Sequence, residues 1–392
     1  MHRRMGFESM MGFGSSISQE SLDNLDIAED LCRRRRPREA VPYLQKAMKD
    51  PRNLDAWVQA AFLAPNLDES METLKFAEEQ GRKLLKKDLG PDCFDDDGDV
   101  VPHFWGMIET RPYMRVLQAQ VRICMESKQY SKAADVSKEM LRLCESDNLG
   151  QRDQYGTLLM LGGRHTEALS WMQAMLDNDG YPPRGETPPP SQEPLSAERM
   201  KEQRFTRAEV LYSSALAAFR LWGDCELARQ YLLMGAQLNP QILIKILAKI
   251  DRPKNLYSGP RSSNSTEDAH DYLWIAQDAW MAPDVWAWAN AQEAARVCAL
   301  KRCSREGCDH TETRAAEFKR CSACHQVVYC SSGCQKQDWP AHKSDCKRRA
   351  QMKEFVRSIV TGKNATNGGA RPPIPTAAAD FAADGSSTTR FF

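Results

Sequence analysis

Eight potential zinc ligands lie within one short stretch of this 392-residue chain. They are seven cysteines and one histidine: Cys303, Cys308, Cys321, Cys324, Cys330, Cys334, His342 and Cys346. The ligands form four successive pairs, and the gap within each pair is short enough for one turn or helical step to direct both side chains at one ion. Because a closed tetrahedral site takes four protein ligands, the pattern predicts two structural Zn²⁺ ions.

Two other chemistries use clustered cysteines. A disulfide framework requires an oxidising compartment, but Met1-His2-Arg3-Arg4 leads into glycine, serine and acidic residues instead of an apolar signal segment. A catalytic zinc keeps a coordination position open for water, whereas here protein ligands suffice to fill every position. Because the region has too little apolar content to fold by itself, we expect the metal to act as its core.

The residues that follow Tyr329 carry a resemblance to a known family. The run that resembles a MYND-type zinc finger reads Cys330-Ser-Ser-Gly-Cys334-Gln335-Lys336-Gln337-Asp338-Trp339-Pro340-Ala341-His342-Lys343-Ser344-Asp345-Cys346. The resemblance covers residues 303–346 and implies a cross-braced arrangement, in which the first and third pairs share one ion and the second and fourth share the other. It assigns two ligand sets: Cys303, Cys308, Cys330 and Cys334 for one zinc, and Cys321, Cys324, His342 and Cys346 for the other.

The beginning of the finger departs from the family pattern. Its first pair, Cys303 and Cys308, is more widely spaced, and a long segment, residues 309–320, separates it from the second pair. The spacing alone leaves the membership of the first pair open. Cys298 and His310 are the candidate substitutes.

The region before the finger shows recurring helical hairpins. Apolar residues at helical spacing flank turns at residues 129–130, 163–165 and 223–225, and a small residue follows each turn: Ala133, Ala168 and Ala228. These units resemble tetratricopeptide (TPR) repeats, whose period is about 34 residues, and more weakly the repeats of the suppressor-of-tumorigenicity 7 family. An irregular helical domain is the alternative. We expect a mainly α fold, in which a TPR-like solenoid precedes the small two-zinc finger.

The composition along the chain suggests five parts. A flexible N-terminus over residues 1–20 precedes TPR-like repeats over 21–255, which a proline-rich loop at 179–197 interrupts; the loop is expected to project from the repeats. Aromatic-rich capping helices over 256–300 follow, with tryptophans at helical spacing that indicate core packing. The finger occupies 301–350, and the composition of 351–392 predicts a disordered tail.

Charge and hydropathy disfavour two classes of partner. The chain has 53 basic and 53 acidic residues, and the finger carries a net charge of only about +2 once two Zn²⁺ and seven thiolates are counted. No apolar run approaches the roughly 18 to 20 residues of a membrane-spanning helix. We therefore expect neither specific nucleic-acid binding nor membrane insertion, and an intracellular location, in the cytoplasm, the nucleus or both.

The sequence favours a non-enzymatic adaptor. The family resemblance implies capture of proline-containing peptides, with Gln335 and Trp339 in the docking groove. The expected partners are proteins that carry proline-rich motifs, and the tail segment Pro372–Pro375 is a candidate internal ligand. The alternatives are a relative of the SET-type protein-lysine methyltransferases, although no SET motif is seen, and a transcriptional regulator that contacts DNA.

Overall fold

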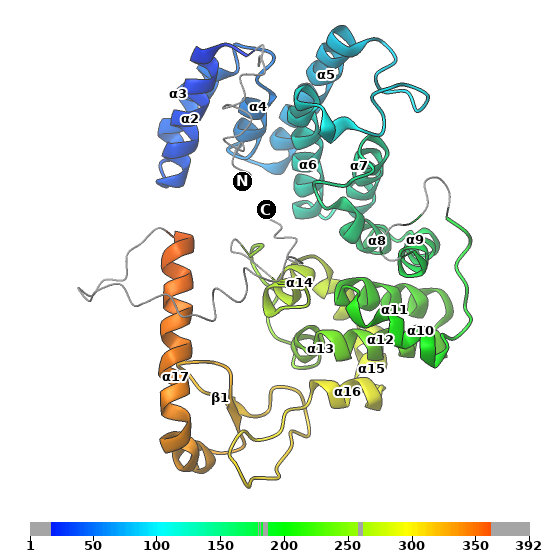
Figure 1. Ribbon diagram of the computed structural model, residues 1–392, viewed down its shortest axis with the longest axis vertical. Helices are drawn as coiled ribbons and strands as arrows, with labels where there is room; N and C mark the ends of the chain where they lie inside the picture. Colours follow the sequence, from blue (N-terminus) through cyan, green and yellow to red (C-terminus); the bar gives the residue numbers. More distant parts are fainter. Residues whose placement is uncertain (1–16, 179, 181, 183–186, 258–261, 362–392) are drawn as a thin grey trace, which may run out of the picture. The chain divides into compact units, whose positions relative to one another are not determined.

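The computed structural model describes residues 17–178, 180, 182, 187–257 and 262–361. The chain divides into two compact units (Figure 1). The first contains the described residues up to Glu193 together with Leu216–Gly223, and the second contains Pro194–Ala215 and the described residues from Asp224 onward. Both units are mainly helical, as the sequence predicts, and the finger belongs to the second.

The first unit is a succession of helices. Its elements are α2 (Gln19–Arg33), α3 (Pro37–Ala47), α4 (Leu54–Ala61), α5 (Leu67–Leu89), the 3-10 turns η1 (Phe104–Gly106) and η2 (Ile108–Thr110), α6 (Arg111–Glu126), α7 (Tyr130–Leu143), α8 (Gln151–Leu161) and α9 (His165–Asp177). Local chemistry starts several of them. Ser18, Asn53 and Asn66 each accept a hydrogen bond from the backbone N–H three residues later, and Pro37 and Pro112 stand in first turns, where no N–H is needed.

Helices that are neighbours in sequence pack as pairs: α2 with α3, α4 with α5, α6 with α7, and α8 with α9. Each pair also contacts the next one along the chain. Gly81 on α5 shows how closely they approach, because a Cβ there would stand 2.8 Å from Leu54 Cδ1 and 2.9 Å from Tyr113 Cδ2. The absence of a side chain therefore lets α4 and α6 pack directly on α5. The hairpins and their turns lie where the sequence places them, while the assignment to the TPR class stays a prediction.

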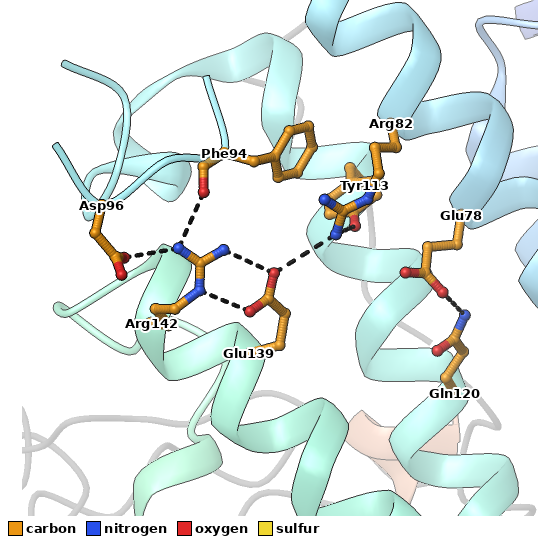
Figure 2. Close-up of polar contacts among 8 residues, drawn as sticks. All are labelled: Glu78, Arg82, Phe94, Asp96, Tyr113, Gln120, Glu139 and Arg142. Atoms are coloured by element: carbon orange, nitrogen blue, oxygen red, sulfur yellow. Dashed lines mark hydrogen bonds and ion pairs between the residues drawn. The ribbon is translucent and has the colours of Figure 1, made fainter. Parts of the chain in front are cut away.

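Two arginines fix the loop that connects α5 to α6 (Figure 2). Arg142 on α7 donates to the carbonyl of Phe94 at 3.0 Å and pairs with Asp96 and Glu139 at 2.7 Å. The guanidinium of Arg82 on α5 lies 4.2 Å from the centre of the Phe94 ring and 3.6 Å from Glu139. Charged hydrogen bonds and a cation–π contact thus hold a loop that forms little regular structure of its own.

The second unit begins with helices and ends with the finger. Its elements are α10 (Ala197–Glu202), η3 (Gln203–Phe205), α11 (Ala208–Trp222, whose last residues belong to the first unit), α12 (Glu226–Leu238), α13 (Pro240–Leu247), α14 (Thr266–Trp280), α15 (Pro283–Ala291), α16 (Glu293–Ala299), β1 (Lys319–Arg320), β2 (Val328–Tyr329) and α17 (Ser332–Thr361). Trp280 is fully buried, meets the ring of Tyr212 edge to face at 5.9 Å and donates to the hydroxyl of Tyr272 at 2.9 Å. These aromatic residues belong to the core of the unit.

The described residues 187–193 of the proline-rich loop contact α9 instead of projecting from it. The side-chain amide of Gln173 on α9 accepts from the backbone N–H of Ser191 and donates to its carbonyl, both at 2.8 Å. Consecutive prolines prevent a helix here, but their extended backbone leaves the next N–H free for a side-chain partner. Residues 187–193 therefore lie along α9.

The expected boundary of the tail also differs. α17 continues past residue 351 to Thr361, because Gln351, Met352 and Glu354 favour helix and neither glycine nor proline interrupts this stretch. Residues 362–392, with the candidate ligand Pro372–Pro375, lie outside the described residues, as do residues 1–16. Within the described part of the chain, no helix combines the length and apolar character that a bilayer-spanning segment needs.

Candidate metal centre

The first ligand pair lies on a closed turn. The N–H of Cys303 donates to the carbonyl of His310 at 2.9 Å, and the N–H of Cys308 donates to the carbonyl of Arg305 at 3.1 Å. Gly307 has a φ of +72°, which glycine adopts without a steric penalty. The wide gap within this pair is therefore one turn that brings both sulfur atoms together.

The second pair lies in the loop of a short β hairpin. Strands β1 and β2 are antiparallel, with Lys319 opposite Tyr329 and Arg320 opposite Val328. Cys321 leaves β1 and donates its N–H to the carbonyl of Val327 at 2.9 Å. The chain then reverses, and this hairpin places Cys321 and Cys324 on a second closed turn.

The third and fourth pairs depend on α17. The hydroxyl of Ser331 accepts from the N–H of Cys334 at 3.1 Å, so the helix starts with Cys330 just before it and Cys334 in its first turn. His342 and Cys346 lie further along the same helix, four positions apart, which is about one turn. One helix thus contributes ligands to two different clusters.

The eight ligands gather into two groups of four. One contains Cys303, Cys308, Cys330 and Cys334; the other contains Cys321, Cys324, His342 and Cys346. Within each group all ligand atoms lie within 4.8 Å of one another. These sets join the first pair to the third and the second pair to the fourth, as the family resemblance implies. Neither candidate substitute belongs to a group: Cys298 contacts the carbonyl of Ala294, and His310 lies next to Cys308 without joining the set.

The spacing of the donor atoms fits tetrahedral zinc. Zn–S bonds of 2.3 Å at tetrahedral angles place two sulfur atoms about 3.8 Å apart. Cys308 Sγ lies 3.8 Å from both Cys330 Sγ and Cys334 Sγ, and Cys321 Sγ lies 3.7 Å from Cys346 Sγ. Thiolate and imidazole are also the donors that structural zinc prefers. The two clusters therefore fit two Zn²⁺ ions.

In each cluster the surroundings lower the pKa of one thiol, Cys308 or Cys321, and raise that of another, Cys330 through a hydrogen bond with Cys334 and Cys346 through burial. The N–H of His310 donates to the sulfur of Cys308 and is the main cause that lowers the pKa of this thiol to about 6. Burial alone would raise the pKa of Cys321, but hydrogen bonds from the backbone of Cys324, the His342 ring and the backbone of Ala323 bring it to about 6. Since zinc binds the deprotonated thiol, the lowered pKa values of Cys308 and Cys321 favour metal binding at neutral pH.

A buried carboxylate organises the long segment between the first two pairs. Glu312 is 3% exposed; its side chain accepts from the N–H of Lys301 at 2.9 Å and from the N–H of Phe318 at 2.8 Å. Its own N–H donates to the carbonyl of Lys301. Charge-assisted hydrogen bonds of this kind are stronger than neutral ones. Glu312 therefore anchors residues 309–320 to the start of the finger.

Arg305 adds a positive charge beside the four-cysteine cluster. The sulfur atoms of Cys334 and Cys308 raise the pKa of Arg305, and its guanidinium donates to the amide oxygen of Gln337 on α17 at 2.9 Å. Four thiolates around Zn²⁺ leave a charge of about −2, which a neighbouring cation stabilises. Nothing in the sequence marks Arg305 or Glu312 as functional beyond their position among the ligands.

The two residues expected to contact a peptide lie on α17. Gln335 is half-buried, while Trp339 is 40% exposed although it stands beside the zinc ligands. The Trp339 ring meets the His342 ring at 6.0 Å and 68°, so part of the indole packs on the core and part faces solvent. Nearby, Tyr329 is buried and donates its hydroxyl to Asp338 at 2.6 Å, which fixes the helix on the hairpin.

The finger has recognisable relatives. Residues 301–346 match the MYND finger family. The chain is 58% identical over 48 residues to an F-box protein of Arabidopsis thaliana, which is 12% of this chain and 14% of that protein. It is 50% identical over 53 residues to SET domain-containing protein 14 of Caenorhabditis elegans, which is 14% and 12% of the two chains, and 44% identical over 39 residues to N-lysine methyltransferase SMYD2 of Homo sapiens, which is 10% and 9%. No solved structure was found to match the chain.

These similarities concern one part of the chain. The family match takes in residues 301–346, and the chain spans well under a fifth of each relative's length. The similarity to the two SET proteins lies over the finger, which is not a catalytic domain. Together, the two four-ligand clusters and the family match show that residues 301–346 form a MYND finger, a zinc-binding module for protein interaction.

Proposed function

We propose that this protein is a non-enzymatic adaptor whose finger binds extended, proline-containing peptides through Gln335 and Trp339. The observation that carries the proposal is the exposure of Trp339. An indole that only packed the helix onto the zinc core would be buried, yet 40% of this residue is exposed. Partly exposed tryptophans combine a large apolar surface with little conformational freedom to lose, and they serve well as binding anchors.

The helix presents both residues to the same ligand. Gln335 and Trp339 are four residues apart on α17, so they lie on one face of the helix. The side-chain amide of Gln335 has no hydrogen-bond partner among the described residues, and it offers both a donor and an acceptor. A proline-containing segment is already extended before binding and loses little entropy when it stacks on an indole.

The helical repeats would supply a second protein surface of this adaptor. The packing of successive helix pairs supports a TPR-like solenoid, since such repeats bury their apolar faces against the next pair. The tail segment Pro372–Pro375 is proposed as an internal competitor for the finger, although it lies outside the described residues.

The two alternative functions have less support. The similarity to lysine methyltransferases covers the finger and supplies no methyl-transfer site in this chain. Binding of DNA is disfavoured because the finger's net charge of about +2 is small for phosphate recognition. A methyl-donor binding assay and a salt-dependent duplex-binding assay would test these two alternatives.

The test replaces Trp339 by alanine and measures binding of a fluorescein-labelled peptide with the sequence of residues 370–377. The tail is removed after Thr361, where α17 ends, so that it cannot compete. We expect binding at least about tenfold weaker in Trp339→Ala, with two zincs retained in native mass spectrometry. Lys343→Ala, an exposed position on the same helix, is the matched control. Equal affinity of Trp339→Ala and the control would refute the proposal.

A further inference from the structure

A proline-rich segment is held against α9 by polar contacts. Residues 187–193, here called the strap, read Thr-Pro-Pro-Pro-Ser-Gln-Glu and form no helix or strand. Most of the strap is exposed, including Pro188, Pro189 and Ser191. Since apolar burial contributes little there, specific hydrogen bonds must determine where this segment lies.

The chemistry of proline explains which atoms α9 contacts. Three successive prolines offer carbonyl oxygens but no N–H, so the first backbone donor after Thr187 is the N–H of Ser191. Gln173 accepts that N–H and donates to the carbonyl of the same residue, both at 2.8 Å. A side-chain amide can make this pair of bonds because its donor and acceptor lie side by side. Gln173 thus supplies the two backbone hydrogen bonds that a neighbouring β-strand would otherwise make with Ser191.

A second contact sets the position of the strap along α9. Ser170 is 6% exposed, and its hydroxyl lies 2.5 Å from the hydroxyl of Thr187 and donates to the carbonyl of Pro188. Because the Ser170 proton goes to Pro188, Thr187 is the donor to Ser170. Ser170 and Gln173 are three residues apart and lie on one face of α9. Together they contact the segment before and after the prolines.

The same device occurs once more in the second unit. There Gln230 on α12 accepts from the N–H of Leu195 at 2.7 Å and donates to its carbonyl at 3.1 Å. Leu195 directly follows Pro194, as Ser191 follows Pro190. The described residues thus contain two glutamine side chains that hydrogen-bond to both backbone groups of the residue after a proline.

We propose that the face of α9 bearing Ser170 and Gln173 is a binding site for extended proline-rich peptides, with the strap as its resident ligand. The site requires consecutive prolines followed by a residue that has an N–H. It is separate from the finger, and the proposal does not depend on the function given to Gln335 and Trp339. Because the strap is tethered, its effective concentration at the site is on the order of millimolar, so another peptide competes only when the strap is weakened.

The experiment weakens the strap without altering the site. Ser191→Pro removes the N–H that Gln173 accepts. The probe is a fluorescein-labelled peptide with the sequence of residues 187–196, added to the full chain. We expect it to bind Ser191→Pro at least about tenfold more tightly than the unchanged chain. Adding Gln173→Leu to Ser191→Pro should abolish this gain, and a probe with proline at the Ser191 position should not bind.

Two controls keep the outcomes distinct. Circular dichroism and zinc content establish that each variant is folded, and Gln192→Ala, at an exposed strap position, should leave binding unchanged. In the unchanged chain, hydrogen exchange of the Ser191 amide should be slow and should accelerate in Gln173→Leu. Binding that is insensitive to Gln173→Leu overturns the proposal. If binding is lost in Trp339→Ala instead, the probe occupies the finger, which overturns the α9 site and leaves the proposed function of the finger standing.

Discussion

Arg305 lies where the charge of a four-thiolate zinc site has to be balanced. The sulfur atoms of two ligands raise its pKa, and its hydrogen bond to the amide oxygen of Gln337 connects the first turn of the finger to α17. The second cluster contains a neutral imidazole in place of one thiolate and carries less negative charge. The two zinc sites therefore differ in how far they depend on a neighbouring cation.

Replacing Arg305 by methionine should weaken the four-cysteine site selectively. Methionine keeps much of the side-chain volume but removes the positive charge beside the thiolates and the hydrogen bond to Gln337. We expect zinc to leave this site roughly 10-fold faster or more when a chelator is added, while release from the site with His342 is unchanged. Release can be followed with a colorimetric zinc indicator, and native mass spectrometry counts the ions that remain.

The matched control for this prediction is Arg314→Met. Arg314 is an exposed arginine of the same finger, and its backbone, rather than its guanidinium, contacts Glu317. If both variants release zinc at the same rate, Arg305 is a surface charge without a specific role at the metal.

At the scale of elements, loops of this protein are positioned by long polar side chains. The connection between α5 and α6 depends on Arg82 and Arg142, the strap depends on Gln173, and the long segment of the finger depends on Glu312. Arg142, Gln173 and Glu312 satisfy backbone groups that no regular element satisfies, whereas Arg82 packs on the ring of Phe94. These positions resemble ordinary surface residues in the sequence, because their partners are distant along the chain.

Arg142→Met should loosen the loop between α5 and α6 without unfolding α7. The change removes the hydrogen bond to the Phe94 carbonyl and the ion pairs with Asp96 and Glu139, which we expect to cost about 1 to 2 kcal/mol of unfolding free energy. Hydrogen exchange should accelerate in residues 93–103. Arg122→Met is the control, since its pair with Glu126 within α6 is worth only about 0.5 kcal/mol. Equal exchange in both variants would contradict the assigned role of Arg142.

For the whole molecule, two kinds of core coexist in one chain. The helical parts bury large apolar side chains such as Trp280 and Tyr113, whereas the buried cluster of the finger consists mostly of its ligands with Tyr329. A hydrophobic core persists without metal, but a core made of ligands does not. The stability of the finger and that of the helices should therefore respond to different conditions.

Chelation of zinc should unfold the finger and spare the helical region. With excess chelator at neutral pH, we expect fast hydrogen exchange over residues 301–349 and little change in helices α2 to α16. The helical circular dichroism signal should fall only modestly, and addition of Zn²⁺ should restore the protection. Exchange that accelerates throughout the helices would instead mean that the metal stabilises the whole chain.

The sequence by itself determined the features that depend on neighbouring residues. The short gaps within pairs identified all eight ligands and the number of zinc ions, and apolar spacing with turn residues located the helical hairpins. Both signals are local, because one turn of backbone decides where two nearby side chains point. The wider gap between Cys303 and Cys308 is also a local feature, because the turn that Gly307 closes brings the two sulfur atoms together.

Only the tertiary structure decided the features that depend on distant residues. Spacing could not say which pairs share an ion; the resemblance implied the cross-brace, and the clusters now show it. The contacts of Arg305 and Gln173 were likewise invisible, since nothing near them in sequence marks a thiolate or a strap as their partner. Proline content predicted an irregular loop at 179–197 but not that residues 187–193 lie along α9. The order of residues encodes local geometry directly, whereas contacts across the chain exist only after the helices have packed.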